Sequence, residues 1–340
     1  CYLVFNTGPA EETLYSRGLR NSMDSSDLYF GFAIDRCYES INIQESNGVT
    51  HGQNVVSCVD SHFLLNCSGL INCFGCVNLR NKSNCFLNEQ LSKDEYNKRV
   101  SEIMGSSERM AQFRKEFDEF ALKFPRRENN NLQSVDSTGD YLSECKNVKD
   151  SFEILKSEDC RYTFSSKLIK DSIGTIGYGT NCERLLECVA VGYSTNIVGT
   201  YGAENCQNIL YGFYTSNCND CVGCDALKNG SFAVFNKEYS KEEYEEIKSH
   251  IVSELKDQDL YGLIMPPALA PFAYNETVAQ DNFPLTKEEA IGQGFRWEDD
   301  IQQTRGKETI HSDDIPDHIN DVLDSITHEV LRCDSCERNY

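Results

Sequence analysis

The chain has 340 residues, with 54 Asp and Glu against 32 Lys and Arg, which gives a formal net charge of −22. A chain of this length can bury more than one core. Its negative charge would repel a phosphate backbone, so we expect no nucleic-acid partner. No apolar stretch approaches the roughly 20 residues that span a bilayer, so we also expect no membrane segment.

The compartment is less well constrained than the charge. The chain begins at Cys1 rather than Met, no segment resembling a secretion signal opens it, and both ends look truncated. Its 17 cysteines are an odd number, so they cannot all be paired within one chain. A reducing compartment favours thiols or metal ligands and an oxidising one favours disulfides. We expect a cytoplasmic protein, and the composition leaves an oxidising compartment open as the alternative.

An internal duplication organises the sequence. Residues 73–96 read CFGCVNLRNKSNCFLNEQLSKDEY, and residues 221–244 read CVGCDALKNGSFAVFNKEYSKEEY. The same offset of 148 residues also places Cys58 on Cys206 and Phe124 on Phe272. The chain therefore contains two copies of one module.

A finer period of about 12 residues runs within each module, and short β-branched and aliphatic segments alternate with Asn, Asp, Gly and Ser turns. The second module repeats at Cys160, Ser172, Cys182, Ser194, Cys206, Cys218 and Gly230, with one step of ten residues. The first module repeats less regularly, at Ser25, Cys37, Ser46, Cys58 and Leu70. A short regular period is typical of a solenoid.

The period predicts a mainly β fold of two tandem parallel β-helix modules, each capped by an α-helix, with a small helical or irregular tail. A coil of only 12 residues would enclose little space, so we expect about 24 residues per coil. An antiparallel sandwich of short strands is the alternative. The predicted regions are residues 1–130 for the first module, 131–265 for the second, and 266–340 for a Pro-containing extension, acidic linker and truncated zinc-ribbon-like tail.

Capping signals place the helices. Ser92 with Glu95, Ser240 with Glu243 and Thr286 with Glu289 have the spacing of capping boxes. A further helix is expected near 106–124, where its apolar face carries Phe113, Phe117, Phe120 and Phe124. A last helix is expected near 317–328.

Two Cys-x-Gly-Cys turns are candidate zinc ligands, since glycine lets the chain turn so that cysteines three apart converge. The four sulfurs of Cys73, Cys76, Cys221 and Cys224 could share one zinc, or each module could hold its own site with Cys67 and Cys85 or with Cys206 and Cys218. The alternative is a row of packed thiols, because cysteine behaves as a small apolar residue. Cys333 and Cys336 are expected to be half of a zinc ribbon.

Catalytic motifs are missing from the sequence, which has no G-x-S-x-G, P-loop, H-E-x-x-H or G-x-G-x-x-G. The six histidines form no ligand pattern, although His51 and His62 could lie on the first module near Cys58 and Cys67. Asp35 and Arg36 have the chemistry that carbohydrate-active β-helix enzymes use, but acidic turn residues are common.

The duplicated run, Ala270-Pro-Phe-Ala-Tyr-Asn-Glu-Thr277 and Phe283-Pro-Leu-Thr-Lys-Glu-Glu289 resemble a family of cysteine-rich repeat proteins from uncultured, small-genome bacteria. The resemblance covers nearly the whole chain and implies a tail with zinc-ribbon-like cysteine pairs, matched here by Cys333 and Cys336. It implies no particular activity. Val49 and Phe63 stand where such relatives carry further cysteines, which weakens the case that every repeated cysteine is a ligand.

The favoured function is a non-enzymatic scaffold or binding protein that takes a protein or glycan on an exposed face, with zinc as its possible cofactor. An enzyme acting on a carbohydrate or acidic substrate is the alternative, and thiol redox chemistry is a third. Three or more Asp, Glu, Arg or His side chains converging in one cleft would favour the enzyme, whereas a flat face would favour binding. The oligomeric state stays open.

Overall fold

The computed structural model describes residues 1–177, 179–301, 305–334 and 339. It is mainly β, with parallel sheets and a few helices, which confirms the predicted fold class at that level. Its contacts divide the chain into unit 1, which is Cys1–Arg126 with the described residues from Arg305 onward, and unit 2, which is Arg127–Ile301. The region expected to form a separate tail is thus divided between the two units.

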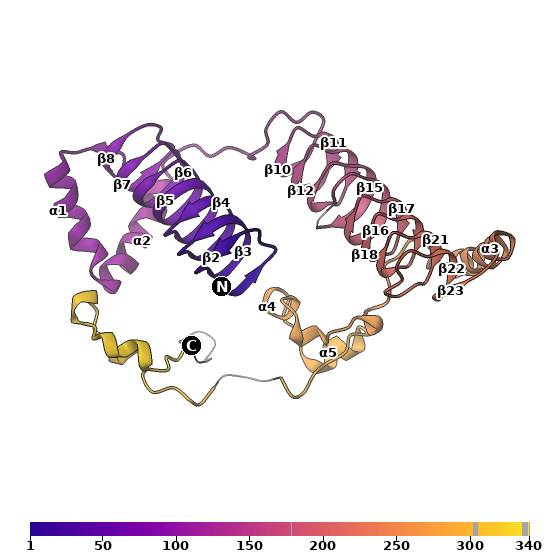
Figure 1. Cartoon of the computed structure of the whole chain (residues 1–340). Coiled ribbons are helices and arrows are strands. Elements are labelled where there is room, and N and C mark those ends of the chain that lie inside the picture. The colour runs from indigo at the N-terminus through magenta and orange to yellow at the C-terminus, as the bar shows by residue number, and fades with distance from the viewer. Residues whose placement is uncertain (178, 302–304, 335–338, 340) are drawn as a thin grey trace. The chain divides into compact units, whose positions relative to one another are not determined.

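The strands of unit 1 form one sheet (Figure 1). They pair in parallel except for the antiparallel pair β8 and β9. The strands are β1 (Tyr2–Phe5), β2 (Ala10–Glu11), β3 (Leu14–Met23), β4 (Ser26–Asp35), β5 (Tyr38–Val56), β6 (Val59–Ser68), β7 (Ile71–Val77), β8 (Ser83–Phe86) and β9 (Glu89–Gln90).

Unit 2 is built in the same way, with parallel pairing up to β22 and an antiparallel last pair, β22 and β23. Its strands are β10 (Gly139–Ser143), β11 (Lys146–Lys149), β12 (Ser151–Leu155), β13 (Glu158–Arg161), β14 (Phe164–Lys167), β15 (Ile169–Ile176), β16 (Cys182–Gly192), β17 (Thr195–Val198), β18 (Tyr201–Glu204), β19 (Gln207–Leu210), β20 (Phe213–Ser216), β21 (Asn219–Val222), β22 (Ser231–Val234) and β23 (Lys237–Glu238).

The strand register differs from the expected spacing. Paired residues on neighbouring strands stand a single repeat of 12 residues apart, as in Leu28 with Ser40 and Ile197 with Ile209, whereas two repeats per coil would place partners about 24 residues apart. The predicted step of ten residues between Ser172 and Cys182 is wrong, because these two residues do not occupy equivalent positions. Cys182 pairs with Ile169, and the backbone N–H of Leu185 donates to Ser172 Oγ across a sequence separation of 13. One inserted residue, rather than two deleted ones, interrupts the period.

Burial follows a period of three instead of the period of two of an ordinary strand. Along β5, the buried residues are Ser40, Ile43, Ser46, Val49, Gly52 and Val55. The residue before each buried position usually has a left-handed backbone, which bends the chain after every three residues. The buried rows hold Leu, Ile and Val together with most of the cysteines.

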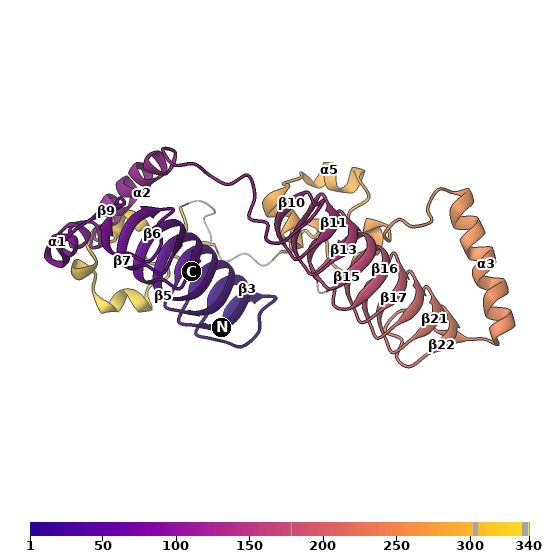
Figure 2. The same cartoon turned by 90° about the horizontal axis from the view of Figure 1, so that it is seen from above.

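The helices α1 (Lys93–Met104) and α3 (Lys241–Asp257) follow the last strands of their units, and α3 lies beyond β22 (Figure 2). Capping boxes are present at α3 and at α5 (Lys287–Gly292). At α1, the Ser92 side chain accepts from the Glu95 N–H. The predicted phenylalanine-rich helix is α2 (Ser107–Ala121). A short helix, α4 (Ala279–Asn282), precedes α5.

The prediction of a helix near 317–328 is wrong. That segment contains two 3₁₀ turns, η4 (Ile319–Asp321) and η5 (Asp324–His328). The physical reason lies in its contacts with the turn between α1 and α2. The Ser107 N–H donates to the Asp317 carbonyl, and the Ile319 N–H donates to the Gly105 carbonyl. These two backbone groups form hydrogen bonds with the turn between α1 and α2, so they are not available for the hydrogen bonds of a helix.

Candidate functional site

A row of residues in unit 1 recurs with the 12-residue period and points away from the interior of the repeats. We call it the His51 row, and it comprises Tyr15, Asp27, Glu39, His51 and Phe63. Each member has a left-handed backbone, with φ between 46° and 55°. Left-handed conformations are costly for residues with a side chain, but here they place five side chains at one bend of successive repeats. The period therefore aligns chemically different groups along one edge.

Helix α2 lies beside this row, and the two enclose a groove of about 710 Å³. That volume falls within the roughly 300–1,000 Å³ of small-molecule sites. The helix is held in place by aromatic contacts, with Phe113 and Phe117 5.1 and 5.8 Å from the ring of Phe63. The groove lining combines aromatic and polar side chains: Tyr15, Asp27, Tyr29, Glu39, His51, Gln53, Phe63, Arg114, Phe117, Asp118 and Arg126.

Three charged or titratable groups converge in the groove. Nδ1 of His51 lies 3.0 Å from Oε2 of Glu39, and the guanidinium of Arg114 lies 2.5 Å from Oε1 of the same carboxylate. Nη2 of Arg114 is also 2.9 Å from Nδ1 of His51. The helix supplies the arginine and β5 supplies the other two residues, so this network also ties α2 to the sheet.

Aromatic rings enclose the imidazole of His51. It stacks on Phe63 with ring centroids 4.4 Å apart, and Tyr38 meets it edge-on at 5.8 Å. Burial lowers the pKa of His51, and Arg114 lowers it further, while the Glu39 carboxylate acts in the opposite direction. The side chain keeps 12% of its surface exposed. His51 is thus a neutral imidazole that a ligand in the groove can reach.

Nδ1 of His51 faces two partners with opposite requirements. A carboxylate only accepts hydrogen bonds and a guanidinium only donates them, so Nδ1 can bond Glu39 as a donor or Arg114 as an acceptor, but not both at once. A second histidine, His62, is held differently. Its Nδ1 is 2.9 Å from Thr50 Oγ1, and burial lowers its pKa to about 4.

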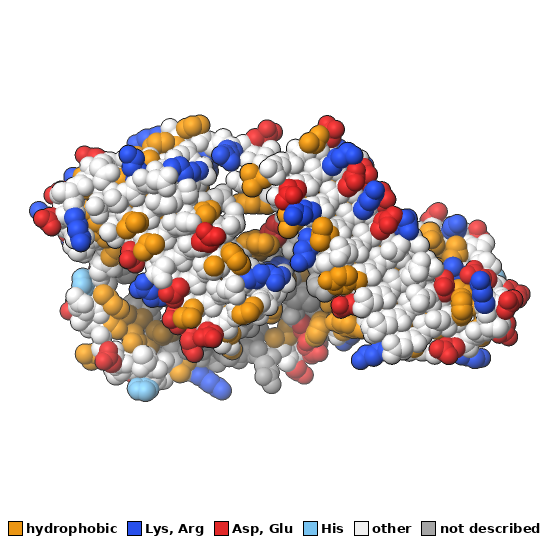
Figure 3. Space-filling model, turned by 45° about the horizontal axis from the view of Figure 1, so that its top comes forward, with side chains coloured by type: hydrophobic (Ala, Val, Ile, Leu, Met, Phe, Trp, Pro, Cys, Tyr) orange, Lys and Arg blue, Asp and Glu red, His pale blue; other side chains and the backbone are white. Residues whose placement is uncertain are grey.

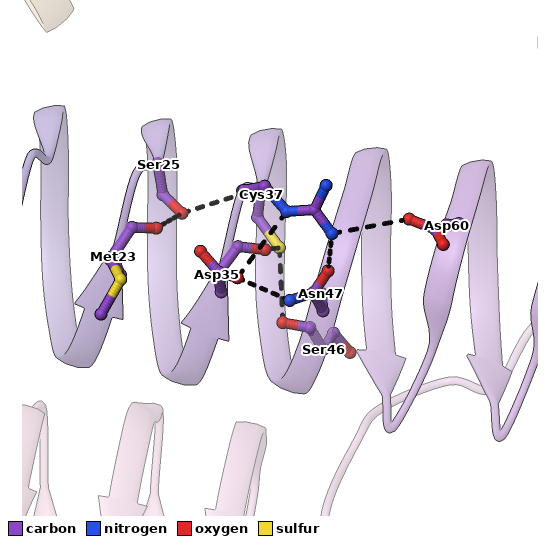
Figure 4. A network of polar contacts seen from close by, with 8 residues as sticks. Met23, Ser25, Asp35, Cys37, Ser46, Asn47 and Asp60 are labelled. Carbon is purple, nitrogen blue, oxygen red and sulfur yellow. Dashed lines mark hydrogen bonds and ion pairs between the residues drawn. The ribbon is translucent and has the colours of Figure 1, made fainter.

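The other sequence candidates for catalysis, Asp35 and Arg36, lie in a separate polar network of unit 1. Figure 4 shows Asp35 beside Asn47 in this network. The Asn47 amide donates to Asp35 Oδ2 at 2.6 Å, and the Arg36 guanidinium donates to Asn47 Oδ1. Arg36 also lies 3.8 Å from Asp60. These contacts join successive repeats, although Oδ1 of Asp35 is buried without a hydrogen-bond partner among the described residues. They form a ladder that holds the repeats together, and the aromatic surfaces of the groove are not part of it.

The candidate zinc ligands lie in the cores. Cys73 and Cys76 belong to the core of unit 1, Cys221 and Cys224 belong to that of unit 2, and each is at most 1% exposed. The thiols pair within each unit. A hydrogen bond with Cys76 lowers the pKa of Cys73 to about 7 and raises that of Cys76. In unit 2, the hydrogen bond between the thiols lowers the pKa of Cys224 to about 6 and raises that of Cys221.

Metal binding at these cysteines stays a prediction. Across the described residues, no three His, Cys, Asp or Glu side chains are arranged to hold a metal ion. The structure brings each Cys-x-Gly-Cys pair together inside its own unit, and Cys73 also contacts Cys85. Of the tail pair, Cys333 is half-buried, and Cys336 lies outside the described residues.

Sequence reasoning missed Glu39 and Arg114. The 12-residue period could have revealed Glu39, because it stands one repeat before His51. Arg114 could not be found in this way, since it comes from a helix outside the repeat.

The described part of the chain contains no helix long and apolar enough to cross a membrane.

Comparisons with known proteins leave the activity open. No protein-family model matches the chain, and no curated protein matches it. Among solved structures, it is similar to a crystal structure from Desulfovibrio desulfuricans G20, provisionally described as an acetyltransferase, at 9% identity. That match covers 76% of this chain and 82% of the other, with a TM-score of 0.13, and therefore carries no argument about fold or activity.

Proposed function

We propose that the chain is a binding protein built on two closed parallel β-helix units, with one turn of the helix per repeat. The proposal about the coil is supported by residues that touch within one strand. Glu39 and His51 are both in β5, where 12 extended residues would span about 40 Å, yet their side chains are 3.0 Å apart. The 12-residue register and the bend after every third residue support the same geometry.

We propose further that the groove between the His51 row and α2 binds a neutral carbohydrate. The observation that carries this proposal is the mixture of groups along its walls. Tyr15 and Tyr29 offer apolar ring surface, while Asp27 and Gln53 offer hydrogen-bonding groups for hydroxyls. A few placed polar groups on an otherwise apolar wall are typical of small-ligand sites.

The charge of the groove favours a neutral ligand. Its three carboxylates, Asp27, Glu39 and Asp118, face the guanidinium groups of Arg114 and Arg126. Arg114 is paired with Glu39, and His51 is neutral because its pKa is lowered. Charged side chains on the surface are also mixed, with Lys and Arg lying among Asp and Glu (Figure 3). No excess of positive charge remains in the groove to attract an anionic ligand.

Isothermal titration with a panel of neutral and acidic oligosaccharides tests this function. We expect the full chain to bind at least one neutral oligosaccharide, and Asp27→Asn and Tyr15→Ala to weaken that binding about tenfold each. The matched control is Glu246→Gln, because Glu246 is exposed on α3 and lies outside the groove. Binding that Asp27→Asn leaves unchanged, or binding confined to acidic oligosaccharides, would contradict the proposal.

A second candidate is an enzyme that acts on the same carbohydrate, and one observation favours it. Glu39, His51 and Arg114 converge in this groove, and a convergence of three such side chains in one cleft is the arrangement expected of an enzyme rather than of a flat binding face. Turnover of a bound oligosaccharide, lost in His51→Gln while binding survives, would support the enzyme. Binding without turnover would favour the scaffold.

A further inference from the structure

A row of apolar residues runs along one face of unit 2. We call it the Phe152 row, and it comprises Phe152, Phe164, Ile176, Val189, Tyr201 and Phe213, each paired with the next in the parallel register. Phe152 is 50% exposed, Ile176 49% and Tyr201 36%. Exposed apolar surface of this continuity marks a binding face on a soluble protein.

The face is flat beside its central part. The residues that follow Phe164, Ile176, Val189 and Tyr201 are Ser165, Gly177, Ala190 and Gly202. Their small size leaves Phe164, Ile176 and Val189 standing clear of these neighbours. At the far end of the row, Tyr201 and Phe213 stack on each other at 5.3 Å, and Tyr214 packs edge-on against both, at 5.2 and 4.8 Å. A flat ligand would therefore meet least obstruction along the part of the row from Phe152 to Val189.

The area of the row is too small for a stable dimer interface. Six strands at about 4.8 Å spacing give a length of about 24 Å, and three residues per strand give a width of about 10 Å. The resulting area, about 240 Å², is well below the roughly 800 Å² that each partner buries in a typical stable complex. A narrow, extended ligand suits the row better than a second copy of the chain.

Hydrogen bonding disfavours an extended peptide. Peptides that bind sheets add to an exposed strand edge, where backbone groups are unpaired. The strands of the Phe152 row pair with neighbours on both sides, from β12 through β18, so their backbone groups are already used. A carbohydrate needs no such edge, because its C–H surfaces stack directly on aromatic rings.

The charges at the ends of the row indicate which carbohydrates fit. The next register positions beyond Phe152 and Phe213 are Asp140 and Asp225. Glu187 also lies next to the row, two residues before Val189. The Asp140 carboxylate already accepts hydrogen bonds from Asn130, and the negative charge of all three carboxylates repels anionic polymers.

From these observations we infer that the Phe152 row is a second binding face, which takes an extended, neutral polysaccharide chain along unit 2. The inference does not depend on the groove of unit 1, since none of the groove residues belongs to unit 2. In this arrangement, one unit recognises a short carbohydrate segment in a groove and the other adheres to a longer polymer.

Co-sedimentation of the full chain with microcrystalline cellulose, chitin and insoluble β-1,3-glucan tests the inference. We expect retention on at least one of these polymers, and we expect the double variant Phe152→Ala/Tyr201→Ala to lower the association constant about tenfold or more. The control is Phe235→Ala, because Phe235 is a more exposed aromatic of unit 2 outside the row.

Several outcomes would overturn the inference. They are absence of retention on all three polymers, equal loss in Phe235→Ala, and preferential retention on insoluble polygalacturonate, an anionic polymer. Sedimentation equilibrium supplies another, because a dimer that the double variant converts to monomer would show that a second copy covers the row. Thermal unfolding of the double variant should match that of the unaltered chain, which separates lost binding from lost folding.

Discussion

Glu39 and His51 lie one repeat apart in β5, and Nδ1 of His51 is 3.0 Å from the carboxylate of Glu39. This contact links the repeat to the candidate site, since the period that spaces the strands also brings an acid and an imidazole together. Arg114 completes the group from α2. The site therefore depends on both the repeat and the helix that packs against it.

Removing the charge of Glu39 should lower the pKa of His51 further. The carboxylate is the main influence that raises this pKa, against burial and Arg114, which lower it. We expect Glu39→Gln to shift the titration of His51 to lower pH in a histidine NMR experiment. Glu187→Gln should leave it in place. A rise in the His51 pKa would show that the carboxylate is not its partner.

Gly75 should be needed for the docking of α2. A Cβ at this position would lie 2.8 Å from Phe113 Cζ, and the backbone φ is +69°. We expect Gly75→Ala to lower the free energy of unfolding by about 1 kcal/mol or more because of the left-handed backbone, and by about 1–3 kcal/mol because of the clash with Phe113. The control is Gly177→Ala, which has a similar φ of +71° and open space around the added methyl. Urea unfolding measures the free energy of unfolding of both variants. Equal losses in the two variants would contradict the packing of Phe113 against Gly75.

Acid should release the segment that carries Asp317. Hydrogen bonds from Ser106, Ser107 and the Glu108 N–H hold the pKa of Asp317 at about 2, below its ordinary value near 3.8. A carboxyl with a lowered pKa stabilises the docked state above its ordinary pKa, and this contribution is lost as the pH falls through about 4 towards 2.

Hydrogen exchange of residues 305–334 measures this release. Asp317→Asn should increase exchange in the segment at neutral pH, whereas Asp324→Asn should not. Exchange that stays slow in Asp317→Asn would assign the docking to the backbone contacts of Asp317 and Ile319 instead.

Serine should replace Cys67 at low cost. The Cys67 thiol donates weakly to the Leu65 carbonyl, and the inward serines Ser46 and Ser61 make the equivalent bond to the residue two before them. We expect Cys67→Ser to lose less than about 1 kcal/mol, and Cys67→Leu to lose about 1–3 kcal/mol through overpacking.

Urea unfolding together with metal analysis checks this expectation. If both variants were strongly destabilised and a bound metal were lost with each, Cys67 would be a ligand rather than a packed thiol.

The sequence was informative where chemistry is local. The capping boxes at Ser240 and Thr286 depend on residues three apart, and the phenylalanine face of α2 depends on helical spacing, so both could be predicted. The 12-residue period was also visible, but the spacing between paired strands was misjudged. The burial period of three, with a left-handed residue in each triplet, is what makes a 12-residue turn around a narrow core possible under the proposed fold.

Long-range contacts were out of reach. Arg114 meets Glu39 across 75 residues of sequence, and Asp317 meets Ser106 across 211. Neither contact leaves a pattern in the repeat, because each depends on where a segment outside the repeat packs. The failed prediction of a helix near 317–328 has the same origin, since docking to the turn at Gly105 overrode its local preference.

The most direct test of carbohydrate binding in the groove is to follow the imidazole resonances of His51 and His62 while oligosaccharide is added. His51 lines the groove and His62 does not. We predict that a neutral oligosaccharide shifts the signals of His51 in a saturable manner and leaves those of His62 nearly unchanged. Saturable binding to the chain with no change at His51, or the same response in both histidines, would contradict the account.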